Sequence, residues 1–423
     1  MRRLLTSAAL AVPLLLPATP ALAAPPDPVE VAAAVETPAL FDDEAGGDAD
    51  ADDPAIWVHP TDRARSLVLA TAKNGGLRVY DLRGRERQAI ATPPPPRPDS
   101  PAGRFNNVDI VRGFPLRGRP VDLAVVTDRG RDTLRFYRID PGTGRLADVT
   151  APGVPYAFSA DQGEVDAQRT AYGVAAYSAP GGAYALVSRR STAEVGLFRI
   201  EARGGAVSYR RVAGLRLPDA FRLPGGATWR PCADPGDGPQ VEGMVADPAN
   251  RVAYLAQETV GLWRVPLAGG GFAGRPVVVE RTREFGVPAA YDPVEEECVV
   301  DYAADPGLGG RIAADVEGLT IYPTGGRAGT LVVSSQGDDT FYAYDRRSNR
   351  PRGRFAVVAG PRTDGSQACD GAAVTATPLP GYPGGLLVVH DGENTPDVPG
   401  GGAEPRANTN FKFLDAGFLG GGM

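Results

Sequence analysis

A strand–turn–strand unit recurs six times along this chain of 423 residues and constrains the fold more than any other feature. Each unit is a short β-branched run, a polar turn that contains Gly or Asp, and a second apolar run that ends near an aromatic residue. Each repeat is long enough for four strands, and no helix-period segments lie between the repeats. This pattern predicts a radial β array with one four-stranded blade per unit. We therefore expect an all-β, six-bladed β-propeller; the alternative is a β-sandwich with irregular insertions. The six aromatic anchors are Tyr80, Tyr137, Phe198, Trp263, Tyr342 and Phe413.

The composition excludes several function classes. Acidic residues number 51 and basic residues 44, and the net charge of −7 disfavours a nucleic acid as partner. His59 and His390 are the only histidines, so a histidine-rich zinc site cannot be built. The 54 glycines and 41 prolines indicate many turns and argue against a helical bundle.

The N-terminus has the pattern of a secretory signal peptide. Arg2 and Arg3 precede an apolar stretch over residues 4–16, and Ala21 and Ala23 form a small-residue cleavage site. The apolar stretch is too short to span a membrane, which disfavours the alternative of a membrane anchor. We expect a signal peptide over residues 1–23, a leader over residues 24–45 and one propeller domain over residues 46–423. The protein is then secreted and has no membrane span.

The three cysteines leave two interpretations open. Cys232 and Cys298 both lie in polar, loop-like surroundings, and in an exported protein a disulfide between them is favoured over free thiols. Cys369 is then left over, and a thiol nucleophile is disfavoured.

The polar turns on one face of a propeller converge on its central channel. Many of these turns carry carboxylate or amide side chains, and Ca²⁺ takes six to eight oxygen ligands. Lys73, Arg129 and the pair Arg189 and Arg190 occupy equivalent turns of three successive repeats, and the other lysine is Lys412. Acids beside cations at one channel mouth indicate a polyanionic ligand bridged by metals, with phosphate as the expected anion.

Nine segments resemble the β-propeller (alkaline, calcium-dependent) phytases, in the order of that family. They are DADADDPAIWVHP, KNGGLRVYDL, GRFNNVDI, QVEGMVAD, DVEGLTIY, SSQG, TDGSQACDG, VHDGENTPD and NFKFL, and they lie within residues 36–414. The resemblance implies a six-bladed propeller that hydrolyses phosphomonoesters of myo-inositol hexakisphosphate, of the 3-phytase type. It also implies several bound Ca²⁺ ions and calcium phytate as the small-molecule substrate; we expect a monomer.

The family motifs also assign roles to individual residues. They imply catalytic calcium ligands at Asp52, Tyr172, Glu242, Glu258 and Glu317, and a tightly held channel calcium at Asn107, Asp109, Asp315 and Gln336. They imply a structural calcium ligand at Asp53 and an outer acidic ligand at Glu36. They imply a further calcium at Asp364 or Asp370 with the stretch from Asp391 to Asn394, which ties down the C-terminal strand. They imply phosphate-binding cations at Lys73, Arg129 and Arg190.

The chain departs from the family pattern where Asn74 follows Lys73, since two adjacent lysines are common there, and where Cys369 replaces a small polar residue. The expected chemistry is metal-assisted attack of water on phosphorus without a covalent intermediate. Two other functions stay open on the sequence alone. One is a calcium-dependent propeller lactonase or esterase, and the other is a non-catalytic propeller that binds phosphate or another ligand.

Overall fold

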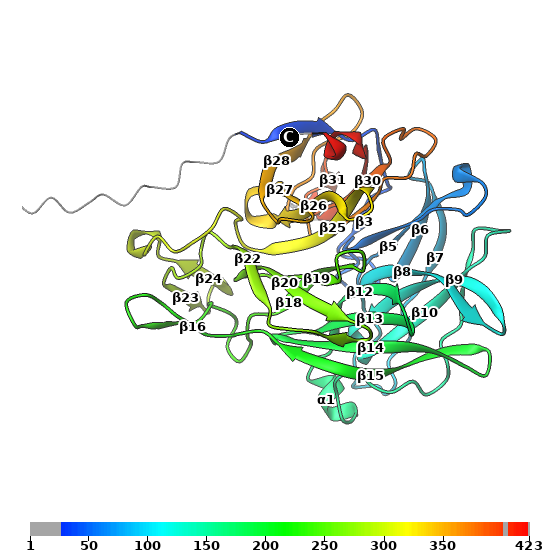
Figure 1. The fold of residues 1–423 in the computed structure, drawn as a ribbon, viewed down its shortest axis with the longest axis horizontal. Helices are drawn as coiled ribbons and strands as arrows, with labels where there is room; N and C mark the ends of the chain where they lie inside the picture. Colours follow the sequence, from blue (N-terminus) through cyan, green and yellow to red (C-terminus); the bar gives the residue numbers. More distant parts are fainter. Residues whose placement is uncertain (1–26, 401–404, 422–423) are drawn as a thin grey trace, which may run out of the picture.

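Six sheets of mainly antiparallel strands surround a central channel in the computed structural model, which describes residues 27–400 and 405–421 (Figure 1). The predicted six-bladed β-propeller is therefore confirmed. The predicted signal peptide lies outside the described residues. In the described ranges, the one α-helix is α1 (Gln162–Asp166), and no helix has the length and apolar character needed to cross a membrane.

Each blade runs from an inner strand at the channel to an outer strand at the rim. The first three blades each consist of four consecutive strands. They are β4 (Pro54–Trp57), β5 (Leu67–Thr71), β6 (Leu77–Asp81) and β7 (Glu86–Ile90); β8 (Phe105–Leu116), β9 (Arg119–Asp128), β10 (Thr133–Ile139) and β11 (Leu146–Asp148); and β12 (Ala171–Ala179), β13 (Gly182–Arg189), β14 (Glu194–Arg203) and β15 (Ala206–Arg216).

The other three blades follow the same plan with additions at their outer edges. Blade 4 consists of β18 (Val241–Asp247), β19 (Val252–Gln257), β20 (Gly261–Ala268) and β22 (Val277–Arg281), with the short β21 (Gly271–Phe272) also paired to β20. Blade 5 consists of β25 (Val316–Gly325), β26 (Ala328–Ser335), β27 (Thr340–Asp345) and β28 (Pro351–Val358). Blade 6 consists of β29 (Ala372–Thr375), β30 (Leu386–Asp391) and β33 (Asn408–Asp415).

The N-terminal segment is part of the propeller and closes the ring of blades. Strands β2 (Val35–Glu36) and β3 (Leu40–Phe41) both pair with β33 of blade 6, and β1 (Val29–Ala32) pairs in parallel with β28 of blade 5. The expected boundary between a leader over residues 24–45 and the propeller therefore falls inside the propeller. Pairing the two chain ends covers sheet edges that would otherwise be open.

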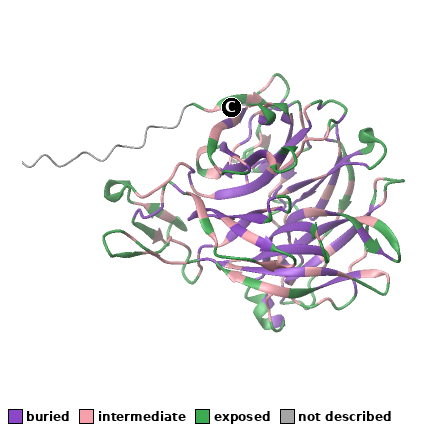
Figure 2. Cartoon of the chain, viewed as in Figure 1, coloured by how far each residue is buried: buried purple, intermediate pink, exposed green. Residues whose placement is uncertain are grey.

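The aromatic anchors of the repeat lie on the third strand of every blade, and all six are buried. They pack into apolar clusters that join neighbouring blades; one such cluster combines Leu69 and Val79 of the first blade with Val126 and Tyr137 of the second. Figure 2 shows the buried residues concentrated in the strands and the exposed ones in the connecting loops.

Two short hairpins rise from the connections on either side of blade 4. They are β16 (Phe221–Arg222) with β17 (Thr228–Trp229), and β23 (Ala289–Asp292) with β24 (Glu297–Val300). The predicted disulfide between Cys232 and Cys298 is confirmed and joins the two hairpin segments, while Cys369 is a buried free thiol. A further small hairpin pairs β31 (Val398–Pro399) with β32 (Pro405–Arg406).

Candidate active site

Three buried glutamates meet at one mouth of the channel. Glu242 comes from the start of β18, Glu258 from the turn after β19, and Glu317 from the start of β25; none is more than 8% exposed. One carboxylate oxygen of each lies within 4.8 Å of those of the other two. Burial raises the pKa of Glu242 to about 7 and the pKa values of the other two well above their usual range, with neighbouring carboxylates adding to the effect. The cluster therefore needs a cation to remain ionised near neutral pH.

Local backbone features place three site side chains at equivalent positions. Tyr172, Glu242 and Glu317 are each the second residue of an inner strand, and the pairing register of each strand shifts directly around that residue. Such bulges redirect side chains. Glycine follows each of the three, because a Cβ on Gly173 would lie 2.0 Å from the carbonyl oxygen of Glu242, and one on Gly243 would lie 2.1 Å from that of Glu317. The Tyr-Gly and Glu-Gly pairs thus let the inner strands approach closely at the mouth.

Unpartnered oxygen atoms indicate that this cluster is built to hold a cation. Asp52 is 1% exposed, and burial followed by the charge of Glu242 raises its pKa well above the usual range. Asp52 Oδ2, Glu258 Oε1 and Glu317 Oε2 are buried and accept no hydrogen bond from the described residues. The hydroxyl of Tyr172, another predicted ligand, is buried in the same group of acids. This all-oxygen donor set fits a hard divalent cation such as Ca²⁺.

The predicted phosphate-binding cations lie beside these acids. Lys73 Nζ is 3.6 Å from Asp370 Oδ2, and although burial opposes its charge, the surrounding carboxylates raise the pKa of Lys73 overall. The guanidinium of Arg129 lies over the ring of Tyr172, 5.6 Å from its centroid. Burial and then the charge of Arg190 lower the pKa of Arg129, so a bound anion would relieve the repulsion between these two cations.

Two amide side chains that the sequence analysis did not assign hold the glutamates in place. Asn106 Nδ2 donates to Glu242 Oε1 at 2.6 Å, and Gln240 Nε2 donates to Glu258 Oε2 at 2.9 Å. Both residues stand inside motifs that had been recognised, Asn106 directly before Asn107 and Gln240 two residues before Glu242. Nothing in the sequence distinguishes them from ordinary turn amides, because their function depends on contacts across blades.

Arg104 is a cation of the mouth that the sequence analysis also missed. Its Nη1 lies 2.7 Å from Asp48 Oδ2 and 3.4 Å from Asn74 Oδ1, and its carbonyl accepts the backbone N–H of Arg129. Arg104 Nε is buried and makes no hydrogen bond within the described chain. The residue therefore supplies positive charge beside Asn74, the position where the family pattern has a second lysine.

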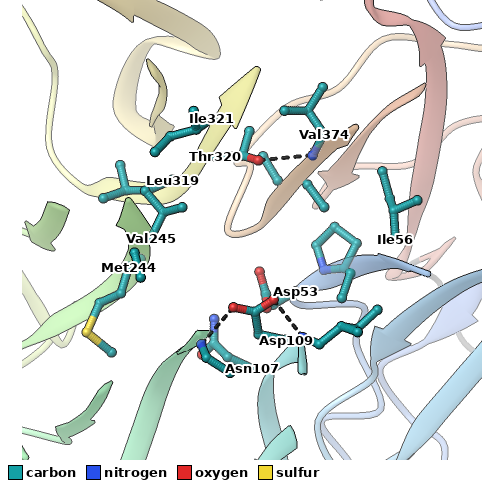
Figure 3. Close-up of a pocket in the computed structure, with 18 of the residues that line it drawn as sticks. Asp53, Ile56, Asn107, Asp109, Met244, Val245, Leu319, Thr320, Ile321 and Val374 are labelled. Carbon is teal, nitrogen blue, oxygen red and sulfur yellow. Dashed lines mark hydrogen bonds between the residues drawn. The ribbon is translucent and has the colours of Figure 1, made fainter. Parts of the chain in front are cut away.

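Three predicted metal ligands lie deeper in the channel. Asp53, Asn107 and Asp109 line a cavity of about 320 Å³ between the inner strands (Figure 3). Backbone N–H groups already hold two of them: Val108 donates to Asp53 Oδ2 at 3.0 Å and Ala176 to Asp109 Oδ2 at 2.7 Å. Burial raises the pKa of Asp53 well above its usual range and that of Asp109 to about 6.

The expected grouping of Asn107 and Asp109 with Asp315 and Gln336 differs from the structure. Asp315 precedes β25 and lines a second cavity together with Glu258, while Gln336 Nε2 donates to Asp370 Oδ1 at 2.7 Å. The physical reason is their different depth in the channel. Asp109 is the fifth residue of β8 and lies inside the channel, whereas Asp315 directly precedes β25 and lies at the mouth. Asp315 and Asp370 accordingly belong to the neighbourhood of the three glutamates.

Glu36, Asp364 and Asp391 converge, but on an ammonium group. Lys412 Nζ is 2.8 Å from Glu36 Oε2 and 3.0 Å from Asp391 Oδ2, and it also contacts Asp364. The Lys412 side chain is fully buried. Asn394 contributes another oxygen at 3.0 Å. The set expected to bind a C-terminal calcium is thus partly neutralised by an ammonium group of the chain itself. Of the two alternatives, Asp364 belongs to this set and Asp370 lies beside Lys73.

Comparisons with known proteins agree with this architecture. The sequence profile of the phytase family matches residues 2–218 and 289–417. The 3-phytase of Bacillus subtilis (strain 168) is 32% identical over 380 residues, which cover 88% of this chain and 81% of that protein. Two solved structures, a protein from Lactobacillus plantarum and the periplasmic gluconolactonase of Pseudomonas aeruginosa, match at TM-scores of 0.39 and 0.38. Their identities are 14% and 15%, over 69% and 71% of this chain and 67% and 68% of theirs.

The protein is a β-propeller. At one mouth of its central channel, buried carboxylates lie beside arginine and lysine side chains. The matches to the family profile and to the Bacillus enzyme show that the chain belongs to the phytase family. It is accordingly a phytase, a hydrolase of phosphate esters.

Proposed function

We propose that the protein is a secreted, monomeric, calcium-dependent phytase that releases phosphate from myo-inositol hexakisphosphate with the specificity of a 3-phytase. The observation that carries the proposal is the cluster of Glu242, Glu258 and Glu317, which lies beside Lys73 and Arg129. Some of its buried carboxylate oxygens accept no hydrogen bond from the described residues. Carboxylates alone would repel a phosphate ester, and cations alone would not require buried acids. The combination fits a substrate anion bridged to the protein by a divalent cation.

In this proposal the chain's own residues bind and orient the reacting groups. Asp52 and the three glutamates hold calcium, which when bound polarises the phosphate and lowers the pKa of a water molecule. Lys73, Arg129 and Arg190 bind the oxygens of the scissile phosphate and stabilise the charge that develops on them during transfer. Asn106 and Gln240 fix the orientation of the carboxylates by the hydrogen bonds described above.

Phosphate release from inositol hexakisphosphate tests the proposal. Purified protein is assayed with millimolar calcium and with excess chelator, and we expect release in the first condition alone. We expect Glu242→Gln to lower kcat/KM by about 100-fold or more, because it removes one charge from the ligand set. Glu86→Gln, on an exposed strand edge, serves as the control. Full activity in chelator would contradict the metal-assisted mechanism.

A further inference from the structure

The face of the propeller opposite the mouth, which we call the far face, is rich in arginine. Glu242 and Glu317 stand at the mouth near the starts of first strands, so the connections from first to second and from third to fourth strands lie on the far face. Within the described residues, these connections contain twelve arginines, no lysine and two acids, Asp62 and Asp140. The N-terminal segment and the connections at the mouth hold more acids than bases. The molecule therefore has one basic and one acidic face.

Two cavities on the far face are lined by arginine side chains. The first lies between blades 2 and 3 and has a volume of about 590 Å³. Arg117, Arg119 and Arg138 line it, and no acidic residue is part of its wall among the described residues. Arg117 and Arg119 are exposed and form no ion pair within the described chain, whereas Arg138 lies 3.9 Å from Asp140. This cavity therefore presents positive charge that the protein itself does not neutralise.

The second cavity lies between blades 4 and 5 and has a volume of about 490 Å³. Its wall carries four arginines and one acid, which are Arg264, Arg327, Arg346, Arg347 and Asp345. The carboxylate of Asp345 is paired with Arg352 at 2.6 Å. Arg327 and Arg347 are exposed and form no ion pair within the described residues. Because guanidinium groups bind phosphate with paired hydrogen bonds, both cavities fit phosphate groups.

The arginines of the far face form two groups on opposite sides of the ring. Blades 1 and 2 carry one group and blades 4 and 5 the other, while the far-face connections of blades 3 and 6 contain no charged residue in the described chain. None of the exposed large apolar side chains among the described residues lies in these connections. The far face thus lacks the exposed aromatic side chains on which nucleic-acid bases stack. An extended, flat array of phosphates contacts both groups at once, which a chain bound in a single groove does not.

We propose that the far face is a docking surface for an anionic phospholipid bilayer, whose phosphate headgroups bind at the two arginine groups. The mouth then points away from the bilayer and stays open to substrate. Salt at about 0.1 M screens charges beyond roughly 10 Å, so the acids of the opposite face do not prevent this contact. The binding is electrostatic and reversible, because the far face has no exposed large apolar side chain to insert. The inference does not depend on the proposed phytase activity.

Sedimentation with lipid vesicles tests the inference. Calcium-loaded protein, freed of excess metal by gel filtration, is mixed at low ionic strength with one of two vesicle preparations. One contains phosphatidylglycerol and phosphatidylcholine, and the other contains phosphatidylcholine alone. We expect the protein to sediment with the anionic vesicles alone and to be released by about 0.5 M NaCl, because salt screens the attraction.

Two pairs of charge reversals distinguish a whole docking face from a single groove. Each basic side chain near an anionic bilayer strengthens binding about fivefold. Arg117→Glu combined with Arg119→Glu should therefore weaken vesicle binding by about 25-fold or more. Arg327→Glu combined with Arg347→Glu, on the other side of the ring, should have a similar effect. The Tm of each variant checks that it is folded.

Arg97→Glu combined with Arg222→Glu is the matched control. Both arginines are exposed in connections on the mouth side, so the pair makes the same change in net charge and should leave binding within about twofold. Equal binding to neutral vesicles, no binding to anionic vesicles, or an equal loss in the control pair would overturn the inference. A loss confined to one of the two far-face pairs would also overturn it. Binding of long-chain polyphosphate without binding of vesicles would assign the far face to a soluble polyanion and exclude the bilayer.

Discussion

Replacing Lys412 by Met isolates the contribution of the buried ammonium to the closure of the ring. The ammonium faces Glu36, Asp364 and Asp391, and the last of these is itself fully buried. Methionine fills similar space without charge, so Lys412→Met leaves three carboxylates without their counter-charge. Removing one partner of a buried ion pair costs about 3–5 kcal/mol. In a chain of this length, such a loss corresponds to a fall in Tm of roughly 4–6 °C.

Differential scanning calorimetry in excess chelator measures this effect. Arg406→Met is the matched control, because Arg406 pairs with Asp43 on the same C-terminal segment but at the exposed surface, where ion pairs contribute little. We also expect calcium to restore part of the Tm of Lys412→Met, since the three freed carboxylates then form an oxygen-only ligand set. A loss of Tm no larger than that of Arg406→Met would refute the reasoning.

Three further predictions concern the mouth of the channel. In excess chelator, the free energy of unfolding should fall as pH rises from 4.5 to 7, because burial raises the pKa of Glu242 from 4.5 to about 7 and the folded state keeps a proton that the unfolded chain releases. Denaturant unfolding across this range should show a slope on the order of 1.4 kcal/mol per pH unit, and a flat profile would contradict the prediction. Gly243→Ala should abolish phosphate release, because its Cβ would meet the carbonyl oxygen of Glu317, whereas Gly225→Ala, with open space around it, should not. Arg104→Gln should raise KM for inositol hexakisphosphate about tenfold and leave that for glycerol 2-phosphate nearly unchanged in steady-state assays, and equal effects on both would refute a role in binding additional phosphates.

The sequence predicts the blades because each repeats the same local pattern. Tyr80, Phe198 and Trp263 mark third strands reliably, since a large aromatic side chain must be buried between neighbouring blades. The ring closure is not predictable in this way. Strand β2 has only two residues, too few for a periodic pattern, and its partner β33 lies more than 370 residues away in the chain.

The same distinction between local and long-range information applies to the site. Glu242 and Glu317 stand in recognisable Glu-Gly motifs, and both lie in the cluster where they were expected. The arrangement of the other acids depends on depth in the channel and on partners from distant blades. Asp109 and Asp315 therefore separate, and the ammonium of Lys412 occupies the centre of a predicted metal site.

The pairing of β2 with β33 sets an order of events during synthesis. Residues 35 and 36 leave the ribosome long before their partners, Phe413 and Lys412, which lie more than 370 residues later in the chain. During translation and any transport across a membrane, the early strands thus have no partner, and the ring is an open arc with two unprotected edges. The ring can close only after β33 has been made, so removal of β33 would leave five complete blades without a closed circle.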